Sequence, residues 1–184
     1  MSYLKIKKHY QTSPYNRVEC VPTDCSETKK KGKCALKGDM SDYIVLKADD
    51  IESINASIEK RDQNKAADCI IFKKKYEAKD RKIILIIELK AQKDPNCKEI
   101  REKLENSGTE IKKIFEKSSI NWGGHQTNFV LLTKDVKKMK ISKKKQKGKN
   151  KKKGGKNDNE LCFDGKKKKI LVKSCDISIE DIWY

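Results

Sequence analysis

Three charged residues at the ends of two short apolar runs are candidates for a catalytic site. Asp68 stands directly before the run 69–72, and Glu88 and Lys90 follow the run 83–87. Two neighbouring carboxylates repel each other, and either an ammonium group or a bound divalent cation relieves that repulsion. Carboxylate oxygens suit Mg²⁺ or Mn²⁺, and such an ion polarises a phosphodiester and lowers the pKa of a bound water. The three residues therefore indicate metal-assisted hydrolysis.

An antiparallel hairpin would bring these side chains together. A turn centred near residue 78 sets Asp68 opposite Glu88, and opposed residues have Cβ atoms about 4.5–5.5 Å apart. Glu88 and Lys90 are two apart on one strand, so they point to the same side. The lysine could then orient a water or stabilise charge that develops on a phosphate. A purely structural alternative stays open, in which Glu88 and Lys90 form an ion pair at the solvent end of a core strand.

Hydrophobic periodicity and turn residues predict the elements around this hairpin. The expected strands are 43–46, 69–72, 83–87, 127–134 and 166–174. The expected helices are 49–63, capped by Asp49 or Asp50, and 94–118, with Asp94 as N-cap and Pro95 at the first helical position. Residues 176–184 would form a short helix or an edge segment. This order predicts an α/β fold with a mixed central sheet flanked by helices.

The acid before one strand and the E-x-K at the end of the next resemble the core of the PD-(D/E)XK nucleases, the restriction-endonuclease-like superfamily. The resemblance covers about residues 50–133. It implies metal-dependent cleavage of phosphodiester bonds, with Asp68 and Glu88 as metal ligands. The backbone carbonyl of Leu89 would be a further ligand, and Lys90 would be the catalytic lysine. Ala67 stands where the family often has proline.

The same resemblance implies accessory residues. The family often adds a glutamate from the helix before the hairpin, and Glu52 and Glu59 are both candidates. Some members carry a glutamine after E-x-K, and Gln92 lies on the same side of the strand as Glu88 and Lys90.

Residues 134–156 carry a second functional signal. This window holds 13 lysines and a single acid, Asp135. Such a density predicts a disordered or flexible loop inside a single domain of residues 1–184, one that contacts phosphates without reading base sequence. The lysines expected to bind nucleic acid are Lys143, Lys144, Lys145, Lys147, Lys149, Lys151, Lys152 and Lys153.

Composition narrows the functional classes. The net charge of +18 favours polyanions, with nucleic acid before anionic membrane. No run approaches the roughly 18 apolar residues of a membrane span, and the N-terminus lacks the apolar segment of a secretory signal. We therefore expect a cytoplasmic protein. Its seven cysteines should be free thiols, and a metal site of Cys20, Cys25, Cys34 and His9 is the alternative.

Two aromatic residues in a predicted turn have competing interpretations. Trp122 and His125 could stack on exposed bases, although packing of Trp122 in the core is favoured.

Taken together, the sequence predicts a Mg²⁺- or Mn²⁺-dependent nuclease that hydrolyses phosphodiester bonds of DNA or RNA, with DNA as the favoured substrate. It would work as a homodimer or with a partner protein, as a subunit of a defence or repair system. The alternative is a non-catalytic module of the same fold that binds nucleic acid through its basic surface or serves as a scaffold.

Overall fold

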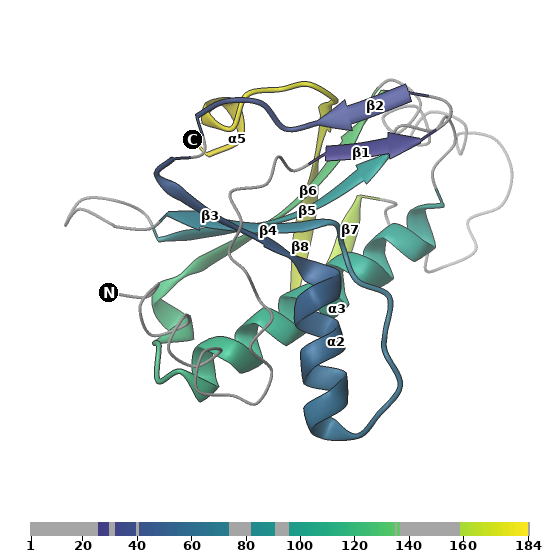
Figure 1. Cartoon of the computed structure of the whole chain (residues 1–184). Coiled ribbons are helices and arrows are strands. Elements are labelled where there is room, and N and C mark those ends of the chain that lie inside the picture. Colours follow the sequence, from purple (N-terminus) through teal and green to yellow (C-terminus); the bar gives the residue numbers. More distant parts are fainter. Residues whose placement is uncertain are drawn as a thin grey trace, which may run out of the picture.

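A six-stranded mixed sheet forms the centre of the protein (Figure 1). The computed structural model describes residues 26–29, 32–39, 41–73, 82–90, 96–134, 136 and 159–183. The strands of the sheet are β3 (Tyr43–Lys47), β4 (Cys69–Lys73), β5 (Ile83–Lys90), β6 (Gln126–Thr133), β7 (Glu160–Phe163) and β8 (Lys166–Ser174). Their spatial order is β3-β4-β5-β6-β8-β7. Strands β3, β4 and β5 are antiparallel, whereas β6 runs parallel to both β5 and β8. The predicted mixed α/β sheet is thereby confirmed.

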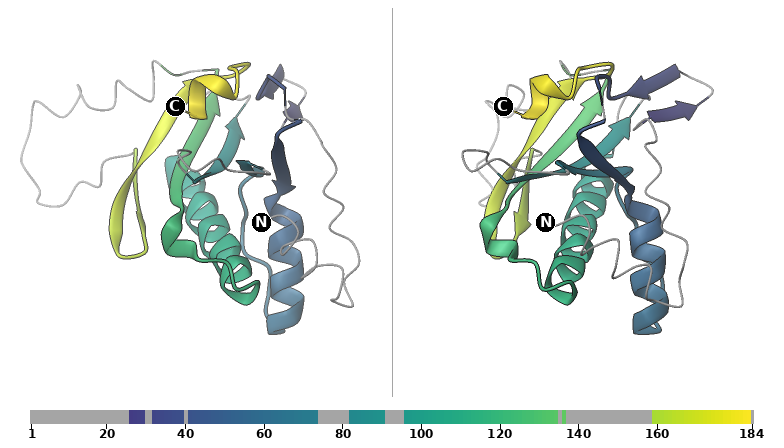
Figure 2. Two further views of the ribbon diagram at one scale, coloured as in Figure 1. Left: turned by 90° about the vertical axis from the view of Figure 1, so that its left-hand side faces the viewer. Right: turned by 60° about the vertical axis from the view of Figure 1, so that its left-hand side comes forward.

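Two helices cover one face of this sheet (Figure 2). They are α2 (Ala48–Glu59) and α3 (Cys97–Lys117). Ile84 and Ile86 of β5 point to this face and share a buried cluster with Leu104 and Phe115 of α3. The apolar stripe of α3 makes this packing possible because residues three and four apart lie on one side of a helix.

Smaller elements cover the opposite face. These are the hairpin of β1 (Ser26–Lys29) and β2 (Gly32–Ala35), and the terminal helix α5 (Glu180–Trp183). Leu85 and Ile87 of β5 are buried on this side together with Trp183. Strand β5 is therefore buried on both faces, which explains its unbroken aliphatic run.

Local differences from the predicted elements have simple causes. Strand β7 and the β1–β2 hairpin were not predicted, because four-residue strands leave little periodic signal. The predicted caps are wrong. Helix α2 follows Lys47 with no side-chain cap, and Asn96 caps α3 by accepting hydrogen bonds from the backbone N–H groups of Lys98 and Glu99.

The expectation of free thiols is also wrong for three cysteines. Cys34 of β2 forms a disulfide with Cys175, which follows β8, and Cys69 is disulfide-bonded as well. A metal site that uses the Cys34 thiolate is incompatible with this bond, while His9, Cys20 and Cys25 lie outside the described residues. Disulfides persist in oxidising surroundings. The cysteines thus give no support to a cytoplasmic location, which stays a prediction.

The helices of the described ranges are all too short or too polar to cross a membrane.

Candidate active site

The hairpin register predicted from the sequence is present in the structure. Cys69 pairs with Ile87 and Ile70 with Ile86, so the next pair along the ladder is Asp68 and Glu88. The backbone N–H of Asp68 donates to the carbonyl of Ile87 at 3.1 Å, which extends the pairing to this end of the strand. Because both acids have even numbers, they lie on the helix-covered face with Ile84 and Ile86.

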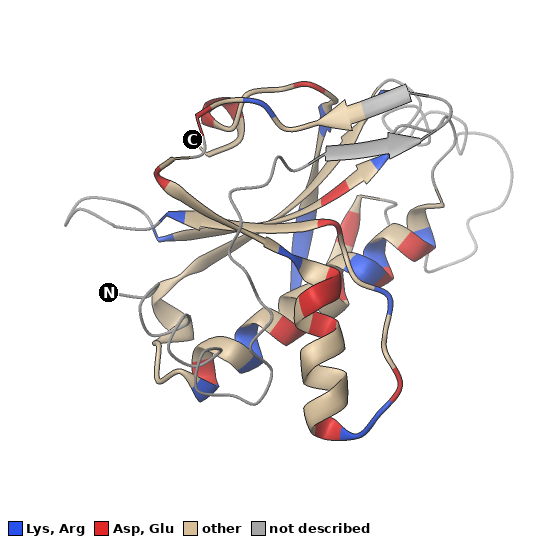
Figure 3. Ribbon diagram, viewed as in Figure 1, with Lys and Arg blue, Asp and Glu red and all other residues tan. Residues whose placement is uncertain are grey.

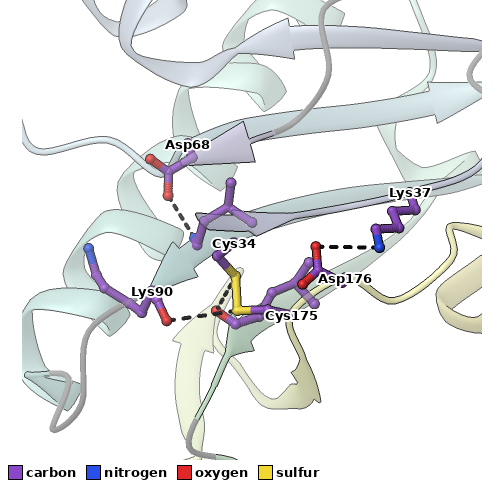
Figure 4. Close-up of a disulfide and its surroundings, with 8 residues drawn as sticks. Cys34, Lys37, Asp68, Lys90, Cys175 and Asp176 are labelled. Atoms are coloured by element: carbon purple, nitrogen blue, oxygen red, sulfur yellow. Dashed lines mark hydrogen bonds and ion pairs between the residues drawn. A yellow bond between two sulfur atoms is a disulfide. The ribbon is translucent and has the colours of Figure 1, made fainter. Parts of the chain in front are cut away.

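Asp68 is fixed by the strand that it faces. Its Oδ2 accepts a hydrogen bond from the backbone N–H of Leu89 at 2.7 Å, and Figure 4 shows this bond beside Lys90. A side chain anchored in this way spends little entropy on reaching a single position. The second oxygen, Oδ1, is not used by this bond.

Glu88 is more deeply buried than Asp68, and its exposed fraction is 0%. Its Oε1 lies 2.7 Å from Nζ of Lys90 and 3.0 Å from Nζ of Lys103. Its Oε2 is buried and has no hydrogen-bond partner within the described residues. Burial, and then the charge of Asp68, raises the pKa of Glu88 to about 7. A carboxyl with this pKa exchanges its proton near neutral pH.

Lys103 is a residue of this cluster that sequence reasoning missed. It belongs to α3, and its ammonium group reaches the end of β5 from the helix layer. Burial opposes its charge, but the charge and hydrogen bond of Glu88 outweigh that effect and raise the pKa of Lys103. The available signal was its place three residues after Ile100 and one before Leu104, at the margin of the buried stripe.

Asp49 is the second acid that the sequence did not single out for this site. It lies in the first turn of α2. Burial and the nearby charge of Asp68 raise the pKa of Asp49, and the charge of Lys103 lowers it. These charge interactions indicate that the start of α2 lies close to Asp68 and Lys103. The resemblance implied a glutamate from this helix at that place.

The two expected accessory glutamates have other partners. Glu52 Oε1 and Glu59 Oε2 each lie 2.6 Å from the guanidinium group of Arg61. Arg61 also reaches Oε1 of Glu110 on α3 at 3.0 Å. Glu52 and Glu59 therefore belong to an ion network that joins α2 to α3. Gln92, the third accessory candidate, lies outside the described residues, as do the predicted nucleic-acid-binding residues Lys143 to Lys153.

The side chains at the hairpin offer a hard divalent cation only two carboxylate ligands. Within the described ranges, no three side chains of His, Cys, Asp or Glu are arranged to hold a metal ion. Asp68 and Glu88 supply two carboxylates, and Glu88 Oε2 is a buried acceptor without a donor. Mg²⁺ often binds through one or two carboxylates and keeps several waters. The two acids match that pattern.

Trp122 and His125 have structural roles. Trp122 packs edge-on against Phe115, with 5.5 Å between the ring centroids. Its Nε1 donates a hydrogen bond to Oδ2 of Asp164 at 3.1 Å. The ring of His125 packs against the same phenylalanine, with 5.1 Å between the ring centroids. Its Nδ1 lies 2.9 Å from the carbonyl oxygen of Asn121. The predicted core packing of Trp122 is confirmed.

A scan against protein-family models, a search of curated proteins and a search of solved structures each found no match.

Proposed function

We propose that this protein is a metal-dependent nuclease that hydrolyses phosphodiester bonds of DNA, built on a restriction-endonuclease-like core. One observation supports the proposal most: a hairpin sets Asp68 opposite a buried Glu88 whose Oε2 has no partner within the described residues, with the Lys90 ammonium 2.7 Å from Oε1. The antiparallel β4–β5 pair, followed by α3 and by the parallel strand β6, has the order that the E-x-K resemblance implies.

Asp68, Glu88 and the carbonyl of Leu89 are the groups that would hold Mg²⁺ or Mn²⁺. When bound, the ion polarises the phosphodiester and lowers the pKa of a coordinated water. Glu88 must lose its proton to act as a ligand, and its pKa of about 7 makes this change accessible at neutral pH.

Lys90 is the residue that we expect to act on the substrate. It is the last residue of β5, and its side chain is 14% exposed. A fixed cation at this place stabilises negative charge that develops on a phosphate in the transition state. Lys103 offsets the charge of Glu88 from the helix side, so Lys90 can leave Glu88 for a phosphate without abandoning a buried unpaired charge.

Cleavage assays with matched variants test the proposal. Wild-type protein is incubated with supercoiled plasmid, single-stranded DNA and RNA in Mg²⁺ or Mn²⁺, beside Glu88→Gln and Lys90→Met. Each change should lower the cleavage rate by about 100-fold or more, because it removes a metal ligand or the stabilising cation. Glu102→Gln, an exposed acid on α3, is the control and should cleave normally. Cleavage that persists in both site variants would remove the assignment.

Metal binding has a readout of its own. Calorimetric titration with Mn²⁺ should give a heat of binding for wild-type protein that disappears in Asp68→Asn and Glu88→Gln. Lys90→Met should keep this heat, since it retains both carboxylates. Equal Mn²⁺ binding by all variants would place the ion elsewhere.

The second candidate function is a non-catalytic module that binds nucleic acid. It is favoured by the two ammonium groups on Glu88 Oε1, which neutralise this acid without a metal ion. In that case the protein binds nucleic acid, while the Mn²⁺ titration gives no heat and no substrate is cut.

A further inference from the structure

Strand β8 presents a row of lysines on one face. Five of its nine residues are lysine. Since side chains alternate along a strand, Lys167, Lys169 and Lys173 lie on the same side as Leu171, which packs against the buried cluster around Leu85. We call these three residues the lysine row. Figure 3 shows the blue stretch that β8 contributes to the ribbon.

The described residues offset only part of the charge of the lysine row. Glu160 of β7 lies opposite Lys169 in the strand register, and no acid of β7 faces Lys167 or Lys173. None of the three lysines forms an ion pair within the described part of the chain, and Lys167 and Lys169 are exposed. The turn acid of the hairpin, Asp164, is used by α3, because Nζ of Lys112 lies 2.7 Å from its Oδ1. Unpaired like charges on one strand repel each other, and a bound polyanion relieves that repulsion.

The spacing of the row suits a phosphate backbone. Alternate residues of a strand are about 6.6 Å apart, so Lys167 and Lys173 are separated by about 20 Å. One strand of a nucleic acid advances about 3.4 Å per charge along the axis, so the row spans roughly six nucleotides. Lysine makes such contacts as a point charge, without selecting bases.

The row ends at the same end of the sheet as the candidate active site. Lys90 pairs with Thr133 of β6, and Thr133 pairs with Ser174 of β8, directly after Lys173. Neighbouring strands are about 4.8 Å apart, so the last residue of β8 lies about 10 Å from the backbone of Lys90. A strand held on the row would therefore reach the end of the sheet that carries Glu88 and Lys90. It would lie on the opposite face, because the row shares its side with Leu171, whereas Glu88 shares its side with Ile86.

We infer that the lysine row is a contact surface for the sugar-phosphate backbone of a nucleic acid strand that passes the end of the sheet near Lys90. Its three lysines are not among those predicted from the sequence to bind nucleic acid. The inference rests on the proposed function for the identity of the polyanion, but it concerns binding and not hydrolysis.

Fluorescence anisotropy of the full-length chain tests the inference. A labelled 20-nucleotide single strand is titrated in EDTA, across a series of salt concentrations, with wild-type protein and with the triple variant Lys167→Gln, Lys169→Gln and Lys173→Gln. The control is a second triple variant with the same change in net charge, made at exposed lysines outside β8: Lys60→Gln, Lys65→Gln and Lys117→Gln. Circular dichroism confirms that all three proteins are folded.

The row variant should bind 10- to 100-fold more weakly at 0.1 M salt, and the slope of log K against log salt should become shallower by about 2, because three phosphate contacts release fewer counterions. The control variant should lose less than threefold. Equal losses in both variants would overturn the inference, since net charge alone would then explain binding. An absence of wild-type binding at low salt would also overturn it.

Two further outcomes distinguish this inference from a membrane contact and from the proposed nuclease activity. If the row variant loses binding to anionic lipid vesicles but keeps its affinity for the oligonucleotide, the surface is a membrane contact and the inference fails. If row-dependent binding is present while no substrate is ever cut, the row stands and the proposed nuclease activity falls.

Discussion

The Nζ of Lys103 on helix α3 lies 3.0 Å from Oε1 of Glu88 on strand β5. It shares this oxygen with Lys90, which approaches from the strand itself at 2.7 Å. One buried carboxylate is thus held by two ammonium groups from two layers of the fold. The two ammonium groups oppose the rise in the pKa of Glu88 that burial and the charge of Asp68 cause.

The raised pKa of Glu88 makes stability depend on pH. With a folded pKa of about 7 and an unfolded value of about 4.3, the folded state binds more protons between these limits. The free energy of unfolding should therefore fall as the pH rises from about 4.3 to 7. Glu88→Gln removes this titration, so the variant should match wild type near pH 4 and exceed it by roughly 3 kcal/mol at pH 8.

Urea unfolding in EDTA at pH 4.5 and pH 8 measures this difference. Glu102→Gln serves as the control because Glu102 is exposed on α3. A Glu88→Gln variant with the same pH dependence as wild type would contradict the burial argument.

Gly108→Ala should destabilise the protein even though alanine is the better helix former. A Cβ at Gly108 would lie 2.8 Å from Cε2 of Phe163 and 3.3 Å from Cδ1 of Ile86. Alanine gains about 1 kcal/mol of helix propensity, but overpacking of a core costs about 1–3 kcal/mol. Thermal unfolding should show a net loss of about 1 kcal/mol, whereas Thr109→Ala on the exposed side of α3 should change stability by less than about 0.5 kcal/mol.

Arg61→Met should weaken the contact between α2 and α3. Arg61 binds Glu52 and Glu110, whose side chains are only 2% and 5% exposed. Without the guanidinium, Glu52 loses the counter-charge at its Oε1, and Glu110 keeps Nζ of Lys113 at 3.0 Å. We expect a cost of roughly 3 kcal/mol. The adjacent Lys60→Met is the matched control, because Lys60 is exposed. Equal urea midpoints for the two variants would show that the network contributes nothing.

Removal of the disulfide between Cys34 and Cys175 should lower stability strongly. The two residues are 141 positions apart, and closing so long a loop stabilises the folded state by about 5 kcal/mol in the chain-entropy description. The double variant Cys34→Ala and Cys175→Ala should therefore unfold at a much lower urea concentration than wild type. Cys162→Ala removes an exposed free thiol and should leave the midpoint unchanged. Peptide mapping without reduction tests the pairing directly.

How far the sequence predicts the fold depends on the range of the interactions involved. The β4–β5 register followed from two apolar runs and one charged turn, because a short hairpin leaves few alternative pairings. Helix α3 followed from its apolar stripe in the same way. In contrast, β7 and the β1–β2 hairpin went unpredicted, since each strand is short and depends on its neighbour for its hydrogen bonds.

The sequence alone determined the local chemistry of this protein: an acid before one strand, and a glutamate and a lysine at the end of the next. Period-two alternation sufficed to put these three side chains on one face. Which distant groups join these three residues depends on the tertiary structure. Lys103 and Asp49 come from helices, Arg61 draws Glu52 and Glu59 into a separate network, and Cys34 pairs with a residue at the far end of the chain. These contacts depend on how whole elements pack against the sheet, and spacing along the chain does not encode that packing.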